Sequence, residues 1–385
     1  MTEKLFYEDS HLITFTASVL SCQQEKDHYK VVLNRTAFFP EGGGQAADTG
    51  MLDSVKVVDV HEKEGVIYHF TDGPLEEGKI VEGKINWEER FSKMQQHSGE
   101  HIISGLIHAK YGYHNVGFHL GKEIVTMDFD GPLTKEELKE IEYKANEAVA
   151  KNLDIQVSYP SKEELANIPY RSKIEIEGQV RIVTIEGYDI CACCAPHVNK
   201  TGEIGLIKLT NVQNYKGGVR VTMMCGFRAL ADYNDKETSV KSISMELSAP
   251  ENGIYEAVQQ LKDEKTVLKS KIAELQKQLI AVKVDQIEKG QKLVCMFEHD
   301  LDGNGPRELV NMILEKETGI GAVFAGNDEK GYRYVIGSRV EDVRPVAKMI
   351  NEEFHGRGGG KPEMVQGSLE GCKEKIYTFL SCNFS

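Results

Sequence analysis

The chain has 385 residues, of which 40% are hydrophobic, and a formal net charge of −14. This length predicts a sizeable core divided over two to four domains, and the composition is that of an ordinary water-soluble protein. No run of about 18 apolar residues exists, which excludes a membrane span, and the acidic balance argues against a uniformly basic nucleic-acid binder while leaving room for a local basic surface.

The start of the chain and its cysteines indicate the compartment. The first seven residues lack the apolar core of a signal peptide, so we expect a cytoplasmic location. Three of the eight cysteines lie within residues 191–194. In a cytosolic chain such clustering points to metal or thiol chemistry rather than to a disulfide framework.

Residues 1–88 have the pattern of a small barrel. Short β-rich segments, separated by polar residues or glycine, occur at residues 11–20, 28–34, 55–61 and 66–70. Three consecutive glycines, Gly42, Gly43 and Gly44, allow positive φ or a close approach of the backbone to another group. A substrate-contacting loop and a wide hairpin turn are both compatible with them. The Lys-Ser/Thr ending of a nucleotide P-loop is missing.

A helix is predicted over residues 90–111, after a link at residues 86–89. It carries His97 and His101, which are four residues apart and therefore lie on one face about one turn apart. Two histidines so placed can bind one metal ion. Taken alone, the pair fits two unrelated histidines on a helix at least as well.

Strands are then predicted at residues 124–129, 155–159 and 180–185, and helices at residues 134–152 and 162–167. Next, Cys193 and His197 repeat the four-residue separation, and Pro196 between them favours a turn over a regular helix. A nitrogen pair and a sulfur–nitrogen pair together suit a tetrahedral zinc ion, although chance could also produce both spacings. Closing strands are expected before residue 225.

Residues 237–292 have a heptad pattern. Apolar side chains recur by fours and threes, with Lys265 in one gap: Ile254, Val258, Leu261, Leu268, Ile272, Leu275, Leu279 and Val282. A dimer arm, a strut that faces a binding partner and a long helix packed on its own neighbours all fit this pattern. We favour a packed or paired helix over a solvent-exposed strut.

The last unit, residues 293–385, alternates strands with helices, which suggests an α/β sheet. Strands are predicted at residues 293–297, 321–325 and 332–337, and helices at residues 306–318 and 343–354. A run of three glycines, Gly358, Gly359 and Gly360, follows, flanked by Arg357 and Lys361. Exposed glycine amides with two cations could bind phosphates. A glycine-rich turn with two solvated cations is the alternative.

Four motifs in one order resemble a known family. The His97–His101 pair, the Cys193–His197 pair and the segments 201–205 and 217–220 resemble the editing domain of alanyl-tRNA synthetase and, more closely, its free-standing AlaX relatives. Residues 39–45 match the glycine motif of the barrel that precedes this domain in the family. The terminal unit resembles the DHHA1 module, as in the long form of AlaX. Because the chain begins at the barrel, we expect no amino-acid activation.

The resemblance implies an α+β fold with four parts. These are a small β-barrel (residues 1–88), an α+β zinc-containing editing domain (89–236), a long coiled-coil-like helical arm (237–292) and a C-terminal α/β DHHA1 domain (293–385). It also implies one zinc ion per chain, held by His97, His101, Cys193 and His197. Gln96 and Asp189, which lie near these ligands in the sequence, are candidates for outer supports. Glu100 is not assigned as a base, because its position on the helix is expected to point elsewhere.

The implied activity is hydrolysis of the ester in tRNA(Ala) mischarged with serine or glycine. A pocket for alanine cannot strongly exclude glycine or serine, so a second site must test the product. The tRNA contacts would involve Gly42, Gly43, Gly44 and the segment from Arg357 to Lys361, and a homodimer through the arm or the terminal unit is expected. The alternative is a non-catalytic RNA-binding protein with a structural zinc ion.

One departure from the family concerns the sulfur ligand. Relatives often have Gly-Gly-Thr where this chain has Cys194-Ala195-Pro196, and Cys191 and Cys194 compete as thiolates. The spacing favours Cys193. Residues 117–121 resemble the part of the family that lines the amino-acid pocket.

Overall fold

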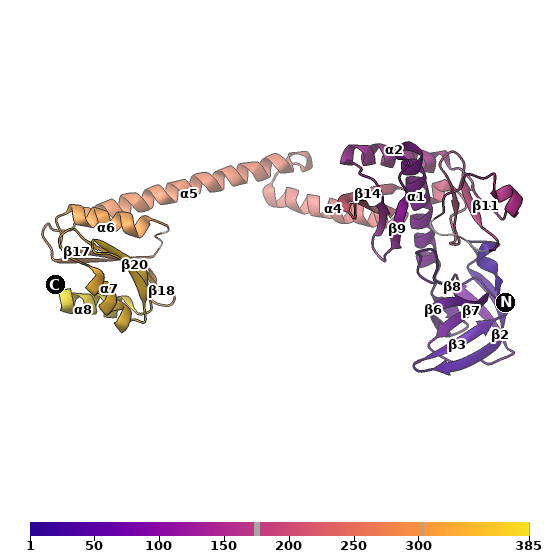
Figure 1. The fold of residues 1–385 in the computed structure, drawn as a ribbon, viewed down its shortest axis with the longest axis horizontal. Coiled ribbons are helices and arrows are strands. Elements are labelled where there is room, and N and C mark those ends of the chain that lie inside the picture. Colours follow the sequence, from indigo (N-terminus) through magenta and orange to yellow (C-terminus); the bar gives the residue numbers. More distant parts are fainter. Residues whose placement is uncertain (173–177, 300, 302, 385) are drawn as a thin grey trace. The chain divides into compact units, whose positions relative to one another are not determined.

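A computed structural model describes residues 1–172, 178–299, 301 and 303–384. The chain has a mixed α+β architecture and divides into two compact units, Met1–Ile243 and Ser244–Ser385 (Figure 1). Among the described residues, no helix is both long and apolar enough to cross a membrane.

The first unit begins with a closed β-barrel, in the region where the sequence predicts one. Its strand order is β2-β3-β7-β6-β5-β8. The strands are β2 (Thr14–Glu25), β3 (His28–Leu33), β5 (Gly50–Leu52), β6 (Val55–Lys63), β7 (Val66–Thr71) and β8 (Ile80–Ile85). A short pair, β1 (Glu3–Lys4) with β4 (Arg35–Thr36), runs beside it. The four predicted segments correspond to β2, β3, β6 and β7, whereas the sequence interpretation missed β5 and β8.

Helix α1 (Trp87–Tyr111) follows the barrel directly (Figure 1). The Asn86 side chain accepts a hydrogen bond from the backbone N–H of Glu89 and so begins the helix. Residues 86–89, predicted as a link, are therefore the cap and first turn. The helix ends at Gly112, which adopts the left-handed conformation that terminates many helices.

Two further sheets pack around α1. One has the order β14-β15-β10-β9 and the other the order β11-β12-β13. Their strands are β9 (Asn115–Leu120), β10 (Val125–Phe129), β11 (Ile155–Ser158), β12 (Ile182–Ile185), β13 (Asp189–Ala192), β14 (Ile207–Tyr215) and β15 (Gly218–Cys225). Helix α2 (Lys135–Lys151) begins with the predicted capping box of Thr134 and Glu137, and α3 (Lys162–Leu165) is a single turn. Helix α1 contacts α2, β13 and β15, so it forms the centre of the core.

A buried ion pair joins α1 to the barrel segment that carries the glycines. The Arg90 guanidinium donates to the Asp48 carboxylate and, at 2.6 Å, to the backbone oxygen of Ala37. One turn later, Lys93 Nζ donates to the backbone oxygen of Ala47 at 2.6 Å. These bonds fix both ends of the segment between β4 and β5 on one helix. Arg90 and Asp48 are 0% and 2% exposed, so both charges depend on this pairing.

The second unit contains a five-stranded sheet with the order β16-β17-β18-β20-β19. Its elements are β16 (Leu293–Glu298), α6 (Gly305–Glu315), β17 (Ile320–Asn327), β18 (Gly331–Ser338), α7 (Arg344–Glu353), β19 (Arg357–Lys361), β20 (Met364–Leu369) and α8 (Lys373–Phe384). Only β16 and β17 pair in parallel. The predicted α/β sheet is therefore a mixed one, and the glycine run is an exposed edge strand, β19, rather than a turn.

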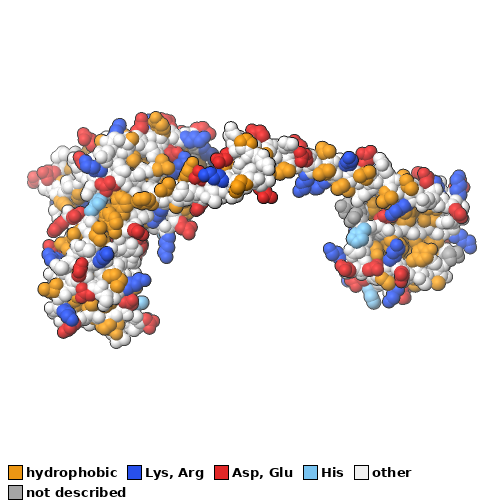
Figure 2. Space-filling model, turned by 180° about the vertical axis from the view of Figure 1, so that it is seen from behind, with side chains coloured by type: hydrophobic (Ala, Val, Ile, Leu, Met, Phe, Trp, Pro, Cys, Tyr) orange, Lys and Arg blue, Asp and Glu red, His pale blue; other side chains and the backbone are white. Residues whose placement is uncertain are grey.

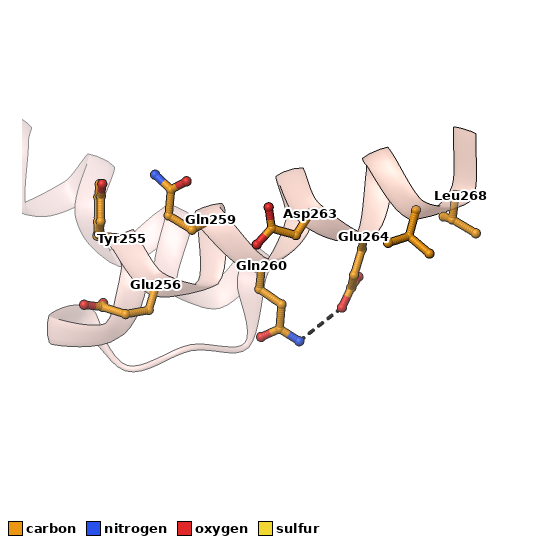
Figure 3. Close-up of a pocket in the computed structure, with 8 residues that line it drawn as sticks. Tyr255, Glu256, Gln259, Gln260, Asp263, Glu264 and Leu268 are labelled. Carbon is orange, nitrogen blue, oxygen red and sulfur yellow. Dashed lines mark hydrogen bonds between the residues drawn. The ribbon is translucent and has the colours of Figure 1, made fainter. Parts of the chain in front are cut away.

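Helices α4 (Gly226–Leu247) and α5 (Ile254–Asp285) occupy the region of the predicted arm. The heptad seam lies on α5, and its side chains are open to solvent in the single chain: Leu268, Ile272 and Leu275 are 54–59% exposed. Apolar side chains are visible along this helix in Figure 2. Figure 3 shows Tyr255 and Leu268 on the same stretch as Gln260, which donates to Glu264. The seam thus has the pattern of a packed helix without a partner among the described residues.

We predict that Arg90→Met lowers the free energy of unfolding of the first unit by about 3–5 kcal/mol, because Asp48 is left buried and unpaired. Urea unfolding followed by fluorescence of Trp87, the only tryptophan in the sequence, measures this change at the start of α1. As a control, Lys208→Met removes a surface pair with Glu142 and should cost at most about 1 kcal/mol. Equal effects of the two substitutions would contradict the proposed role of the buried pair.

Candidate metal site and its cavity

The four residues predicted as ligands converge in the first unit. His97 and His101 extend from one face of α1, and Cys193 and His197 lie in the segment just after β13. One ligand atom from each lies within 4.8 Å of the others. Cys193 Sγ is 3.4 Å from Nε2 of both His97 and His197. Three nitrogens and one sulfur so placed could hold one metal ion.

Each histidine is oriented through its other ring nitrogen. Nδ1 of His97 lies 3.2 Å from Gln45 Oε1, Nδ1 of His101 lies 2.9 Å from Asp189 Oδ2, and Nδ1 of His197 lies 3.0 Å from Ser98 Oγ. If each Nδ1 carries the proton of its hydrogen bond, each Nε2 is left as a lone-pair donor. Oxygen partners of this kind support ligating histidines in metalloproteins, so the donor set fits a metal ion.

Asp189, predicted as an outer support, contacts His101 and has a second partner. Arg171 donates to both of its carboxylate oxygens, at 2.7 and 2.9 Å. Burial alone would raise the pKa of Asp189, but the hydrogen bonds from His101 and Arg171 outweigh it and lower this pKa. The group is therefore an anion that fixes the ring of His101.

The ionisation of Cys193 and His197 suits ligation. Burial would raise the pKa of the Cys193 thiol, but the neighbouring His97 and His197 hold it well below its usual value, which favours the thiolate. Burial lowers the pKa of His197 to about 3, so that its ring is neutral. By contrast, burial raises the pKa of Cys191 and Cys194 to about 11. Among these three thiols, Cys193 is thus the best ligand, in agreement with its spacing.

Gln96 does not support the ligands. Its side chain donates to the backbone oxygen of Cys225 at 2.8 Å and accepts from the N–H of Cys225 at 2.7 Å. Neighbouring residues on a helix point about 100° apart, so the side chain of Gln96 is turned away from that of His97 and contacts β15. The sequence interpretation of Gln96 was wrong, and it missed Gln45 and Ser98, which come from the glycine segment and from α1.

A cavity of about 670 Å³ opens onto His97, His101 and Cys193. Gly43 and Gly44 form part of its wall, as do Val116, Gly117 and Phe118 of β9. Gly44 has a φ of +79°, and a Cβ atom there would lie 2.8 Å from the Phe118 ring. The glycines therefore let the barrel segment pass close to the site, and their backbone forms a surface without side chains.

Glu100 lies on the same wall, contrary to our expectation from the sequence. It is 2% exposed, and its Oε1 accepts hydrogen bonds from Ser104 and Asn115. Its Oε2 is 3.9 Å from Nε2 of His101. Because Glu100 follows His97 by three residues, the helical period could have placed both on one face.

The other predicted contacts lie in the second unit. Every residue of β19, including Gly358, Gly359, Gly360, Arg357 and Lys361, is exposed. The three glycines line a groove of about 410 Å³ with residues of α7, among them Arg344 and Lys348.

We predict that the purified chain holds about one transition-metal ion, and that His101→Ala loses most of it. His108→Ala is the matched control, because His108 lies on the same helix and contacts the backbone oxygen of Tyr113 instead of the cluster. Elemental analysis of gently purified protein measures both. Less than roughly half an ion per wild-type chain would count against the site.

Comparison with known proteins identifies three segments of the chain. Residues 2–89 match the family described as tRNA synthetases class II (A), residues 180–222 match the threonyl and alanyl tRNA synthetase second additional domain, and residues 289–382 match the DHHA1 domain.

Full-length relatives agree with these matches. The alanyl-tRNA editing protein AlaX-L of Pyrococcus horikoshii is 26% identical over 98% of this chain and 97% of its own length. An alanyl-tRNA editing protein of Rattus norvegicus is 27% identical over 94% of this chain and 93% of its own length. The alanine–tRNA ligase of Ignicoccus hospitalis is 31% identical, but the chain spans only 42% of its length. Over nearly its whole length the chain is thus similar to alanyl-tRNA editing proteins, among them AlaX-L, and its last part matches the DHHA1 domain.

Proposed function

We propose that the chain is a trans-editing hydrolase that cleaves the aminoacyl ester of tRNA(Ala) mischarged with serine or glycine. The observation that carries this proposal is the cluster of His97, His101, Cys193 and His197 at the wall of a cavity large enough for an aminoacyl group and its ribose. The names of the relatives that match nearly the whole chain support the same reaction.

The ion that suits this donor set is zinc, one per chain. When bound, zinc would supply a Lewis acid for the ester carbonyl or for water, or a grip on the amino group of the substrate. The protein's own residues orient the ligands through Gln45, Ser98 and Asp189, and they present the neutral backbone of Gly43 and Gly44 to the substrate.

The alternative function is RNA binding with a purely structural zinc ion. Four protein ligands can saturate a tetrahedral ion, as structural sites do. The cavity that opens onto three of the four ligands favours catalysis, because a structural site is normally closed.

We expect the wild-type protein to hydrolyse seryl- or glycyl-tRNA(Ala) faster than alanyl-tRNA(Ala). His101→Ala should lower this rate at least about 10- to 100-fold, because even the outer supports of a metal site have effects of this size. Release of labelled amino acid from the three tRNAs measures the rates, with His108→Ala as the control. Equal stability of all three esters with and without protein would leave only the RNA-binding alternative.

We further propose that the chain forms a homodimer in which the seam of α5 is covered by a second copy. The seam residues repeat over 29 residues from Ile254 to Val282, which is about four heptads, long enough for a stable pair of helices, and the apolar ones from Leu261 onward are exposed. A Lys at one seam position, Lys265, is tolerated in such a pair and can set its register.

Leu268→Glu should therefore shift the molar mass in solution from two chains towards one. Val267→Glu is a matched control, because Val267 is 65% exposed on the same helix but points away from the seam. Light scattering after size-exclusion chromatography, at several protein concentrations, compares the two. A wild-type mass of one chain, or equal effects of both substitutions, would refute pairing through this seam.

We also propose that β19 binds tRNA phosphates with Arg357 and Lys361. Both cations are exposed, and β20 pairs with only one edge of this strand. The three glycines between the cations present no side chains, so a phosphate backbone can approach the strand closely.

Replacing Arg357 and Lys361 together by Gln should weaken tRNA binding and reduce the slope of log Kd against log salt by about 0.7–0.9 for each phosphate that the variant no longer neutralises. The control replaces Arg339 and Lys375, two exposed cations of the same unit, by Gln. Fluorescence titration with unacylated tRNA at several salt concentrations gives the slopes. Matching slopes for the two double variants would show that the net charge alone is responsible.

A further inference from the structure

One part of the cavity wall has no role in the metal cluster. It consists of Lys4 and Tyr7 from the start of the chain, Tyr159 after β11, and Arg181 before β12. These residues come from three separate segments of the sequence, and they combine aromatic rings with cations. That combination is typical of sites for single-stranded nucleic acid.

Arg181 is the best-defined of these groups. It is only 9% exposed, and its Nη1 donates to the backbone oxygens of Cys193 at 2.8 Å and Ala195 at 3.0 Å. Its guanidinium lies 5.1 Å from the ring centre of Tyr7. Its Nε is buried and has no hydrogen-bond partner among the described residues. A buried cation with an unused donor in a cavity wall indicates an anionic ligand.

Lys4 is less available for a ligand. Its Nζ lies 5.6 Å from the Tyr7 ring centre, but it is paired with both carboxylate oxygens of Glu62, at 2.6 and 2.8 Å. Glu62 offsets its charge. Arg181 therefore supplies the charge at this end, while Tyr7 is half-buried and Tyr159 is 43% exposed.

The size of the cavity calls for a ligand larger than an amino acid. Its volume of about 670 Å³ lies within the range of roughly 300–1,000 Å³ found for pockets that enclose a drug-sized molecule. A seryl or glycyl group would fill only a small part of it. The remaining space adjoins the tyrosines and Arg181.

We propose that Tyr7, Tyr159 and Arg181 form a subsite for the terminal nucleotide of the aminoacylated RNA. This inference rests on the proposed function and names the residues that bind the nucleotide. The tyrosine rings stack on the base, and Arg181 binds the phosphodiester on the 5′ side of the terminal ribose. Because Arg181 is one hydrogen bond away from the backbone of Cys193, a nucleotide held there has its ester beside the metal ligands.

Binding of a short RNA without an amino acid tests the subsite apart from hydrolysis. The probe is a four-nucleotide single-stranded RNA with a 3′-terminal adenosine, followed by fluorescence anisotropy with the full chain. Tyr7→Leu should weaken binding between roughly five- and 150-fold, the effect of losing one stacked base, whereas Tyr7→Phe, which keeps the ring, should bind like the wild type. Tyr159→Leu should act in the same direction.

The matched control is Tyr68→Leu on the barrel strand β7. Tyr68 is also half-buried and also lies beside a cation, with Lys30 Nζ 4.4 Å from its ring centre, but it does not line the cavity. Wild-type affinity in both Tyr7→Leu and Tyr159→Leu would overturn the proposal, as would an equal loss in Tyr68→Leu.

A second measurement addresses Arg181. Arg181→Gln should reduce the slope of log Kd against log salt by about 0.7, the value for one phosphate on a single strand. Since Arg181 also holds the Cys193 loop, the metal content of the variant is measured in parallel. If Arg181→Gln keeps its metal content and its salt slope equals that of the wild type, Arg181 is not part of the subsite. If Arg181→Gln loses its metal, the tyrosine variants decide whether the subsite exists.

The deacylation assay separates this inference from the proposed function. If the wild type hydrolyses seryl-tRNA(Ala) but neither Tyr7→Leu nor Tyr159→Leu changes KM or RNA affinity, the subsite is refuted and the function stands. If the wild type hydrolyses no ester but the RNA probe binds and responds to the tyrosine substitutions, the function is refuted and the nucleotide site stands.

Discussion

The buried pair of Arg90 and Asp48 is the constraint on which the candidate site depends. It lies at the start of α1, and two turns later the same helix provides His97. Lys93, between them, holds the backbone of Ala47. Gln45, two residues before Ala47, then reaches His97. One helix thus carries two of the predicted metal ligands and also fixes the barrel segment that faces them. The positions of the glycine wall and of these ligands are therefore both set by α1.

This arrangement explains why the local features could be predicted from the sequence. The histidine pair on α1 follows from the helical period, and the capping box of Thr134 and Glu137 follows from its spacing. The four candidate ligands could be named because each pair is local and the family resemblance joined the two pairs. Most strands of four or more residues with β-rich composition were also predicted near their observed positions.

The supports of the site could not be predicted in the same way. Gln45 and Arg171 reach the cluster from segments that are distant in the sequence, so no local spacing marks them. Gln96 was misassigned because its place next to His97 in the sequence was taken to mean that the two side chains are close in space. Glu100 was left out because its place next to His101 was taken to mean that it points elsewhere, although it also follows His97 by three residues and so can share its face of the helix. The glycine run of β19 was ambiguous because glycine carries no hydrophobic pattern, and only its pairing with β20 makes it a strand.

The path from Arg90 to His97 has a thermodynamic consequence. A metal ion at the site would bind a conformation of α1 that also requires the barrel segment to be in place, although the barrel supplies none of the four clustered side chains. By linkage, metal binding would stabilise the ordered barrel segment by the same free energy by which an ordered segment would strengthen metal binding. A change that loosens Asp48 or Ala47 would therefore lower metal affinity. The stability of the N-terminal barrel would therefore depend on whether the site holds a metal ion, and α1 would carry this dependence.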